Sequence, residues 1–217
     1  MIAIKKGPVP QALVDYKLNK GSSFDDFSEK DAIRDSLIRE QYGLCAYCMS
    51  RIFNDVTYGK ENRQVHCKIE HFKAQTKYPE LQLDYKNMLG CCGGNEGQSK
   101  KYQTCDTRKG DLDLMFNPAD ENDCKKMEIR FYKDGTIHSG NVDFDVQLNT
   151  VLNLNASHLV SARKSLLDAA FAVLNKTRGS RTKSQIQHFI DKYSALKNGN
   201  HMPFYYVVVY YLKKHLR

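Results

Sequence analysis

Two sets of residues that can do chemistry alternate between Cys45 and Lys109. The outer set consists of cysteines, namely Cys45, Cys48, Cys91, Cys92 and Cys105. The inner set consists of Glu70, His71, Asn87 and Asp106. Thiolates suit a structural zinc ion, whereas carboxylates and an imidazole suit the hydrolysis of a phosphodiester. The order of the two sets predicts a nuclease site held together by a metal.

The cysteine spacing predicts a structural zinc site. Cys45 and Cys48 form a Cys-x-x-Cys pair, in which two thiolates from one tight turn bind the same ion. A tetrahedral zinc then needs two more ligands, and Cys105 is the natural third. The fourth is Cys91 or Cys92, because adjacent residues do not easily serve one ion. The alternatives are buried structural cysteines or a redox pair, and a redox pair has no use for the additional cysteines.

The inner residues match the separate tasks of phosphodiester hydrolysis. His71 can take a proton from water near neutral pH, and Asn87 can fix a loop or the imidazole ring through hydrogen bonds. Glu70 and Asp106 offer hard oxygen ligands to a catalytic divalent ion, magnesium or manganese. Taken singly, the two carboxylates would be read as solvated surface groups. Their order within the cysteine set is what favours a catalytic site.

The ordered motif resembles the HNH endonucleases, whose core is a ββα-metal fold. The matching segments are Ile69-Glu70-His71-Phe72, Asp84-Tyr85-Lys86-Asn87-Met88-Leu89, Cys92, and Cys105-Asp106-Thr107-Arg108-Lys109. By this resemblance His71 is the general base and Asn87 the middle Asn. Asp106 takes the third position, where a His or Asn is more usual, and Glu70 stands where the family often has Asp or His as a metal ligand.

The resemblance covers nearly the whole chain and points to the HNH nucleases of retron-associated and Septu-type systems (PtuB-like). The flanking segments that carry it are Ile4 to Gly7 with Pro10, Gln41 to Cys48, Lys109-Gly110-Asp111, Phe116-Asn117-Pro118, and Leu152 to Asn155 with Arg163. It implies an effector of bacterial anti-phage defence that acts with an ABC-type ATPase (PtuA-like). It also selects Cys92 over Cys91 as the fourth zinc ligand, by the distance from Asn87.

Three basic residues beside the motif are candidate contacts of nucleic acid: Lys73, Arg108 and Lys109. The family places a basic residue at Lys109, and that residue can approach a phosphate. The net charge of +8 and the pI near 9.0 fit a partner of polyanions. DNA is the first candidate substrate and RNA the second.

The composition bounds the fold and the location. With 217 residues and 41% hydrophobic content, the chain can bury a core as one domain or as two small ones. Its apolar runs are too short to span a bilayer and its first residues do not form a secretion signal, so a cytoplasmic protein without a membrane partner is expected. In such a reducing compartment, seven cysteines favour metal ligation over disulfides.

The expected fold is α+β, with a small zinc-stabilised ββα-metal core and mostly helical flanks. Residues 1–44 are expected to form an arm and a helix that dock a partner or pack on the core, 45–116 the nuclease core, and 117–217 a hairpin and a helical C-terminal region. Residues 1–28 are expected to be irregular. The N-terminal helix is expected to start at a capping box of Ser28 and Asp31.

Periodicity predicts the remaining elements. Alternation predicts a strand over 65–72, and Asp134-Gly135 predicts a hairpin. Apolar stripes predict core-facing helices from Leu159 to Leu174 and from Ile186 to Leu196, joined by a basic linker over 176–183 that can touch phosphate. Pro203 opens a last element that is either a helix or a strand.

One alternative function belongs to a different class. A zinc-dependent nucleic-acid adaptor without catalysis would need the cysteines and the basic residues. It would have no use for a Glu-His pair, an Asn and an Asp in this order, which is why the nuclease is preferred.

Overall fold

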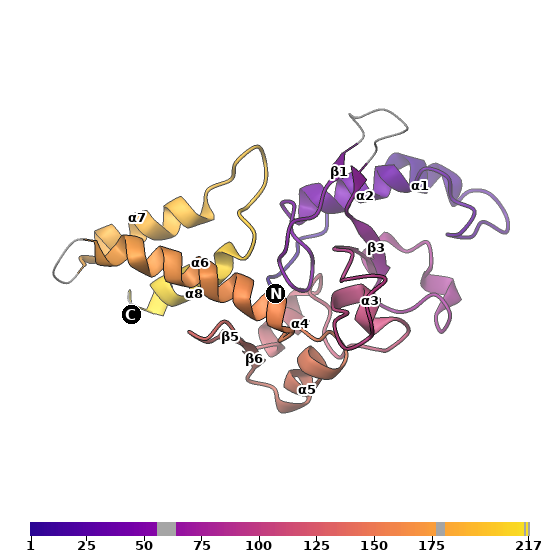
Figure 1. The fold of residues 1–217 in the computed structure, drawn as a ribbon. Helices are drawn as coiled ribbons and strands as arrows, with labels where there is room; N and C mark the ends of the chain where they lie inside the picture. Colours follow the sequence, from indigo (N-terminus) through magenta and orange to yellow (C-terminus); the bar gives the residue numbers. More distant parts are fainter. Residues whose placement is uncertain (56–63, 177–180, 215, 217) are drawn as a thin grey trace.

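The computed structural model describes residues 1–55, 64–176, 181–214 and 216 (Figure 1). Over these residues the chain is α+β, as predicted, with three two-stranded sheets among its helices. The helices are α1 (Gln11–Tyr16), α2 (Lys30–Glu40), α3 (Cys105–Lys109), α4 (Glu121–Lys126), α5 (Val142–Thr150), α6 (Ser157–Asn175), α7 (Lys183–Ser194) and α8 (Tyr205–Lys214), with 3-10 turns η1 (Pro79–Leu81) and η2 (Tyr85–Asn87). The strands are β1 (Asn54–Asp55), β2 (Gln64–Val65), β3 (Lys68–His71), β4 (Met88–Cys91), β5 (Ile129–Phe131) and β6 (Ile137–Ser139).

The elements lie in two groups. In Figure 1, α1, α2, α3, β1 and β3 lie on one side of the molecule, and α6, α7 and α8 lie on the other. Helices α7 and α8 pack against each other, and α8 also contacts α6 and β5. The cysteines and the polar motif belong to the first group, so the long C-terminal helices support the site from outside.

The N-terminal region differs from the prediction in two ways. Residues 1–28 are not wholly irregular, because α1 forms and buries Leu13 completely in a cluster with Phe24, Phe27, Ile33 and Leu37. This apolar packing orders the segment. The capping box is also wrong, since α2 begins at Lys30 and its N-cap residue makes no side-chain hydrogen bond to the helix.

The hairpin of β3 and β4 carries the centre of the predicted motif. The two strands are antiparallel, with Lys68 opposite Cys91 and His71 opposite Met88. Because side chains alternate along a strand, Lys68 and Glu70 leave β3 on one face and Ile69 and His71 on the other. The single strand predicted over 65–72 is divided into β2 and β3, with an interruption at residues 66–67.

The C-terminal predictions are largely confirmed. Strands β5 and β6 pair around the predicted turn, where Gly135 has a φ of +90° and a Cβ would meet the Val160 carbonyl at 2.3 Å. A glycine is therefore required where this hairpin touches α6. Both apolar stripes form helices, α6 and α7, and the last element is a helix, α8. Residues 177–180 of the predicted basic linker lie outside the described residues.

The main hydrophobic core joins the cysteine-rich segments to the C-terminal region. It contains Cys45, Cys105 and Leu114 together with residues of α5, α6 and α8. The Phe116 and Phe144 rings lie 5.1 Å apart between centroids, across the predicted border at residues 116 and 117. The core thus continues from one predicted region into the next.

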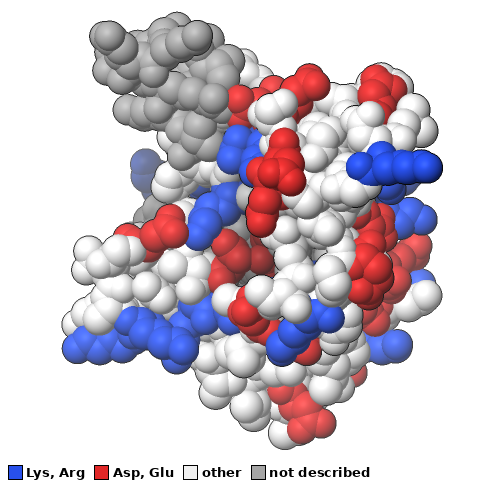
Figure 2. Space-filling model, turned by 90° about the vertical axis from the view of Figure 1, so that its right-hand side faces the viewer, with Lys and Arg blue, Asp and Glu red and all other residues white. Residues whose placement is uncertain are grey.

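The surface charges are mixed where they can be followed. The face in Figure 2 shows Lys and Arg interspersed with Asp and Glu. On this face the net positive charge of the chain does not gather into one basic patch. None of the described helices is both long enough and apolar enough to cross a membrane.

We predict that Arg163→Met lowers the free energy of unfolding by about 2–4 kcal/mol, because two buried carbonyl groups lose their donor. Arg163 is 1% exposed, and its guanidinium donates to the Gly135 carbonyl at 2.6 Å and to the Leu154 carbonyl at 2.7 Å. Urea unfolding measures the loss. The neighbouring exposed Lys164→Met is the control, and equal stability of the two variants would contradict the role given to Arg163.

Candidate functional site

The four cysteines selected by the sequence form one buried cluster. The sulfurs of Cys45, Cys48, Cys92 and Cys105 lie within 4.8 Å of one another. Cys91 is buried but stands outside this group, since adjacent residues at the end of β4 point in different directions. Cys92, and not Cys91, is thus the cysteine of this adjacent pair that lies in the cluster.

The cluster fits a tetrahedral zinc ion. Zinc–sulfur bonds of about 2.3 Å place the ligand atoms of a tetrahedron roughly 3.8 Å apart, and the Cys48 and Cys92 sulfurs are separated by 3.7 Å. Burial raises the pKa of Cys45, whereas contact with Cys105 lowers the pKa of Cys92. As thiolates, four sulfurs in so small a buried space would repel one another, and a divalent cation would remove this repulsion. The cluster can therefore hold a metal such as zinc.

A buried glutamine fixes the Cys-x-x-Cys turn to strand β4. The Gln41 amide donates to the carbonyls of Leu44 and Gly90, each at 2.7 Å, and its Oε1 accepts from the Gly90 amide at 2.7 Å. The Ala46 amide also donates to the Gly90 carbonyl. These bonds hold the turn beside the strand that leads into Cys92.

We predict that the purified chain carries one zinc ion and that Cys92→Ser loses it, because this sulfur belongs to the cluster. The same variant should also lose folding cooperativity, because metal binding contributes to folding free energy. Elemental analysis and thermal unfolding measure the two effects. Cys91→Ser is the matched control and should keep its zinc, and a Cys92→Ser protein with full zinc content would refute the assignment.

Glu70 is the most buried member of the polar motif and is already paired. It is 3% exposed, its Oε1 accepts from the Tyr47 hydroxyl at 2.9 Å, and the same oxygen lies 2.8 Å from the Lys109 Nζ. Burial, together with the neighbouring Asp106 carboxyl, raises the pKa of Glu70 well above its usual range, and the Lys109 ammonium opposes this shift. The Glu70 carboxyl thus has the Asp106 carboxyl and the buried Lys109 ammonium as neighbours.

Asp106 is the accessible carboxylate of the pair. It follows Cys105 at the start of α3, and 17% of its side chain is exposed. Its Oδ2 lies 3.4 Å from the Lys68 Nζ, which also contacts Glu96 at 3.2 Å. Since the Cys105 sulfur belongs to the cysteine cluster, the cluster positions Asp106 against Glu70.

His71 is held in one orientation by the neighbouring loop. Its Nε2 lies 2.9 Å from the Gln82 carbonyl, which can only accept, so Nε2 carries the proton and Nδ1 keeps its lone pair. Phe24 packs on the imidazole at right angles, with ring centroids 4.5 Å apart. Burial lowers the pKa of His71 while the Gln82 carbonyl opposes the shift, so the ring is neutral near pH 7. A neutral, oriented imidazole is the form that can accept a proton.

Asn87 fixes the loop that follows β3. Its Oδ1 accepts from the Lys73 amide at 2.8 Å, and its Nδ2 donates to the carbonyls of Lys73 at 3.0 Å and Leu81 at 3.3 Å. The Asn87 carbonyl also accepts from the Phe72 amide. The side chain therefore closes the loop that carries Gln82, the partner of His71. This matches the positioning task expected for Asn87.

The three predicted nucleic-acid contacts differ in accessibility. Lys109 is 1% exposed, and its Nζ donates to the His71 carbonyl at 3.2 Å besides pairing with Glu70. The prediction that Lys109 contacts a phosphate is therefore wrong for this structure, since its ammonium points inward. Arg108 donates to the Lys100 carbonyl at 2.7 Å, and Lys73 lies 3.7 Å from Asp113, both near the surface.

Sequence reasoning gave no role to Tyr47 or Gln82. Tyr47 lies inside the Cys-x-x-Cys turn, is fully buried and donates to Glu70. Gln82 presents its carbonyl to His71, and its Oε1 accepts from the Phe24 amide at 2.9 Å. A carbonyl is available at every residue, so no residue type reveals the role of Gln82. The role of Tyr47 could have been predicted from its place inside the Cys-x-x-Cys turn. A tyrosine in a buried turn usually finds a hydrogen-bond partner for its hydroxyl.

Comparisons of the chain with protein-family models and with curated proteins find no match. The chemistry of the site therefore rests on the geometry of its own residues.

We predict that Lys109→Met lowers the free energy of unfolding by about 3–5 kcal/mol, because it leaves the Glu70 carboxylate buried without its cation. Adding Glu70→Gln should recover part of this loss, since the unpaired charge is then removed. Chemical unfolding of the two single variants and the double variant measures the coupling. Lys125→Met, which removes an exposed pair with Glu121 on α4, is the control and should change little. Additive effects of the two site substitutions would contradict the pairing.

Proposed function

We propose that this chain is a metal-dependent HNH-type endonuclease that hydrolyses phosphodiester bonds. The observation that supports this most is His71, a neutral and oriented imidazole whose Nδ1 keeps its lone pair, directly following Glu70, whose carboxyl adjoins that of Asp106. The order β3, β4, α3 brings these groups together and agrees with the strand, strand, helix order of a ββα-metal core. Asn87 supports the same assignment by closing the loop behind the imidazole.

The proposed reaction is in-line hydrolysis. The His71 Nδ1 takes a proton from a water molecule, the water oxygen forms a bond to phosphorus, and the opposite phosphorus–oxygen bond breaks. The leaving oxygen takes its proton from solvent. The Gln82 carbonyl stabilises the imidazolium that forms, because it accepts a hydrogen bond from Nε2 in both protonation states.

Magnesium or manganese is the proposed catalytic cofactor, in addition to structural zinc. A divalent ion, when bound, neutralises charge on the scissile phosphate. Glu70 and Asp106 are the residues that would hold it, and their oxygens are of the type such ions prefer. Asp106 is the more accessible of the two, since Glu70 already contacts Tyr47 and Lys109.

The biological setting is proposed from the resemblance to the retron-associated and Septu-type nucleases. In that setting the chain is the effector of an anti-phage system, works in the cytoplasm and acts with an ABC-type ATPase. DNA is the first candidate substrate and RNA the second.

A non-catalytic zinc-dependent adaptor is the second candidate function, and one observation favours it. Glu70 is buried and forms an ion pair with Lys109, as expected of a structural carboxylate in a binding module. The adaptor predicts binding of nucleic acid without cleavage at any magnesium concentration. His71 separates the two functions, because the adaptor does not need its free Nδ1.

We predict that the purified chain, alone or with a candidate ABC-type ATPase, cleaves labelled DNA or RNA when magnesium or manganese is added. His71→Ala should reduce the rate by about 100- to 10,000-fold, because the proton acceptor is lost. Zinc content should be unchanged, since His71 lies outside the cysteine cluster. His188→Ala on α7 is the matched control and should cleave like the wild type.

Magnesium should be withheld and then restored, because a strong chelator would also remove zinc. Full cleavage by a folded His71→Ala protein would contradict the role of the base. Binding without cleavage by the wild type, with and without the ATPase, would favour the adaptor.

A further inference from the structure

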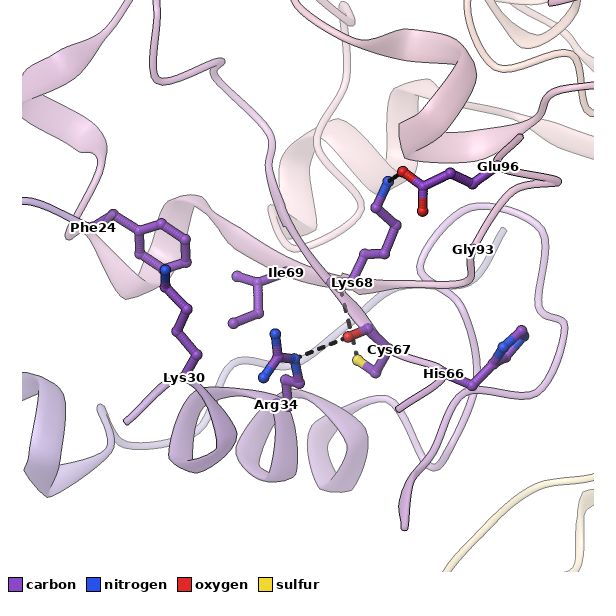
Figure 3. A pocket seen from close by; sticks show the side chains of 9 residues that line it. All are labelled: Phe24, Lys30, Arg34, His66, Cys67, Lys68, Ile69, Gly93 and Glu96. Carbon is purple, nitrogen blue, oxygen red and sulfur yellow. Dashed lines mark hydrogen bonds and ion pairs between the residues drawn. The ribbon is translucent and has the colours of Figure 1, made fainter. Parts of the chain in front are cut away.

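A groove between α2 and β3 lies beside the candidate site. It encloses about 520 Å³, and its walls carry the cationic side chains of Lys30, Arg34 and Lys68 and the aromatic ring of Phe24. Figure 3 shows Lys30 and Arg34 leaving α2 on the side that faces β3. The two residues are four positions apart on the helix, so they lie on one face of it.

The walls of this groove touch both halves of the candidate site. The Phe24 ring packs on the His71 imidazole with centroids 4.5 Å apart. On the other strand face, the Lys68 Nζ lies 3.4 Å from Asp106. A chain bound along the groove would therefore lie one side chain away from the proposed base and one side chain away from the accessible carboxylate.

The groove carries more positive than negative charge. Its lining contains three cationic side chains, Lys30, Arg34 and Lys68, against one carboxylate, Glu96, which pairs with Lys68 at 3.2 Å. His66 adds an imidazole at the far end. A wall of this kind favours an anion, and a polynucleotide supplies repeated anionic groups.

Among the three cationic side chains of the groove, Lys30 is the one whose charge is not neutralised by a carboxylate of the described residues. Its Nζ donates to the Asp25 carbonyl at 3.0 Å and lies 5.0 Å from the centroid of the Phe24 ring, and neither group carries a charge. No carboxylate of the described residues forms an ion pair with it. Arg34 is partly engaged, because its Nε donates to the Cys67 carbonyl at 3.1 Å and its Nη1 lies 2.9 Å from Asp31.

We infer that this groove binds the phosphodiester backbone of the polynucleotide next to the bond that is cut, with Lys30 as a phosphate contact. The inference rests on the proposed nuclease function and extends it to residues outside the resembling motif. Arg34 contributes positive charge while anchoring α2 to the strand segment at Cys67. Because Lys109 is buried, the basic contact is assigned to the groove and not to Lys109.

The test measures the affinity of the zinc-loaded full chain for labelled single-stranded DNA, duplex DNA and RNA in magnesium-free buffer over a range of salt concentrations. Lys30→Gln should weaken binding by roughly threefold or more and reduce the slope of log affinity against log salt by about 1, as expected for one lost phosphate contact. Lys30→Arg should keep the slope. Lys192→Gln on α7 is the control and should behave as wild type. The substrate arms show which polymer the groove prefers.

Cleavage provides an independent readout. Lys30→Gln should raise KM by a similar factor and leave kcat unchanged, because it removes binding and no group that acts on the scissile bond. An unchanged affinity and salt slope for Lys30→Gln would overturn the inference, even if the wild type cleaves. Binding that depends on Lys30 in a chain that never cleaves would support the groove and remove the nuclease function.

Discussion

The cluster of four cysteine sulfurs is the constraint on which the rest of the site depends. It joins the turn at Cys45 and Cys48, the end of β4 and the start of α3, which are far apart in the sequence. Four sulfurs at this spacing can bind a divalent cation as thiolates, and such binding would contribute to the folding free energy. Once the cluster is held, Asp106 and Tyr47 have little freedom, because each is adjacent to a sulfur ligand. The relative position of Glu70 and Asp106 thus depends partly on the cysteine cluster.

The Lys109–Glu70 pair gives the site a second internal connection. Lys109 ends the short helix α3 that begins with Cys105, and its ammonium reaches both the Glu70 carboxylate and the His71 carbonyl. Such a buried ion pair adds little to stability relative to apolar packing, because both groups lose their hydration. It does select one arrangement of helix and strand, since any other leaves two charges unpaired. The pair therefore contributes mainly to the precision of the site.

The sequence predicted the parts of this molecule that depend on local pattern and on residue chemistry. The hairpin at Asp134-Gly135 follows from turn chemistry, and helices α6 and α7 follow from periodicity. The choice of Cys92 over Cys91 comes from the resemblance to the HNH endonucleases. The sequence missed α1 and the true start of α2, because both depend on packing around Leu13 and Phe27 rather than on a cap. It also placed Lys109 at the surface, because a lysine is rarely buried without a partner. The partner, Glu70, is 39 positions earlier in the sequence, so the pairing could not be seen before the fold was known.

The polar motif divides into a buried part and an accessible part, and this division has a chemical reason. Glu70, His71 and Asn87 are each 6% exposed or less, and their hydrogen bonds to Tyr47, Gln82 and Lys73 fix them before any ligand arrives. Groups fixed in this way need no reorganisation during a reaction. Asp106 and Lys68 stay partly exposed, and Lys68 lines the groove. Phe24 packs on the His71 ring and also lines the groove, so this side chain connects the two. The residues that are buried and held in one orientation are thus different from the charged residues that stay accessible to a ligand. This separation lets the His71 imidazole remain neutral and oriented although charged side chains lie nearby.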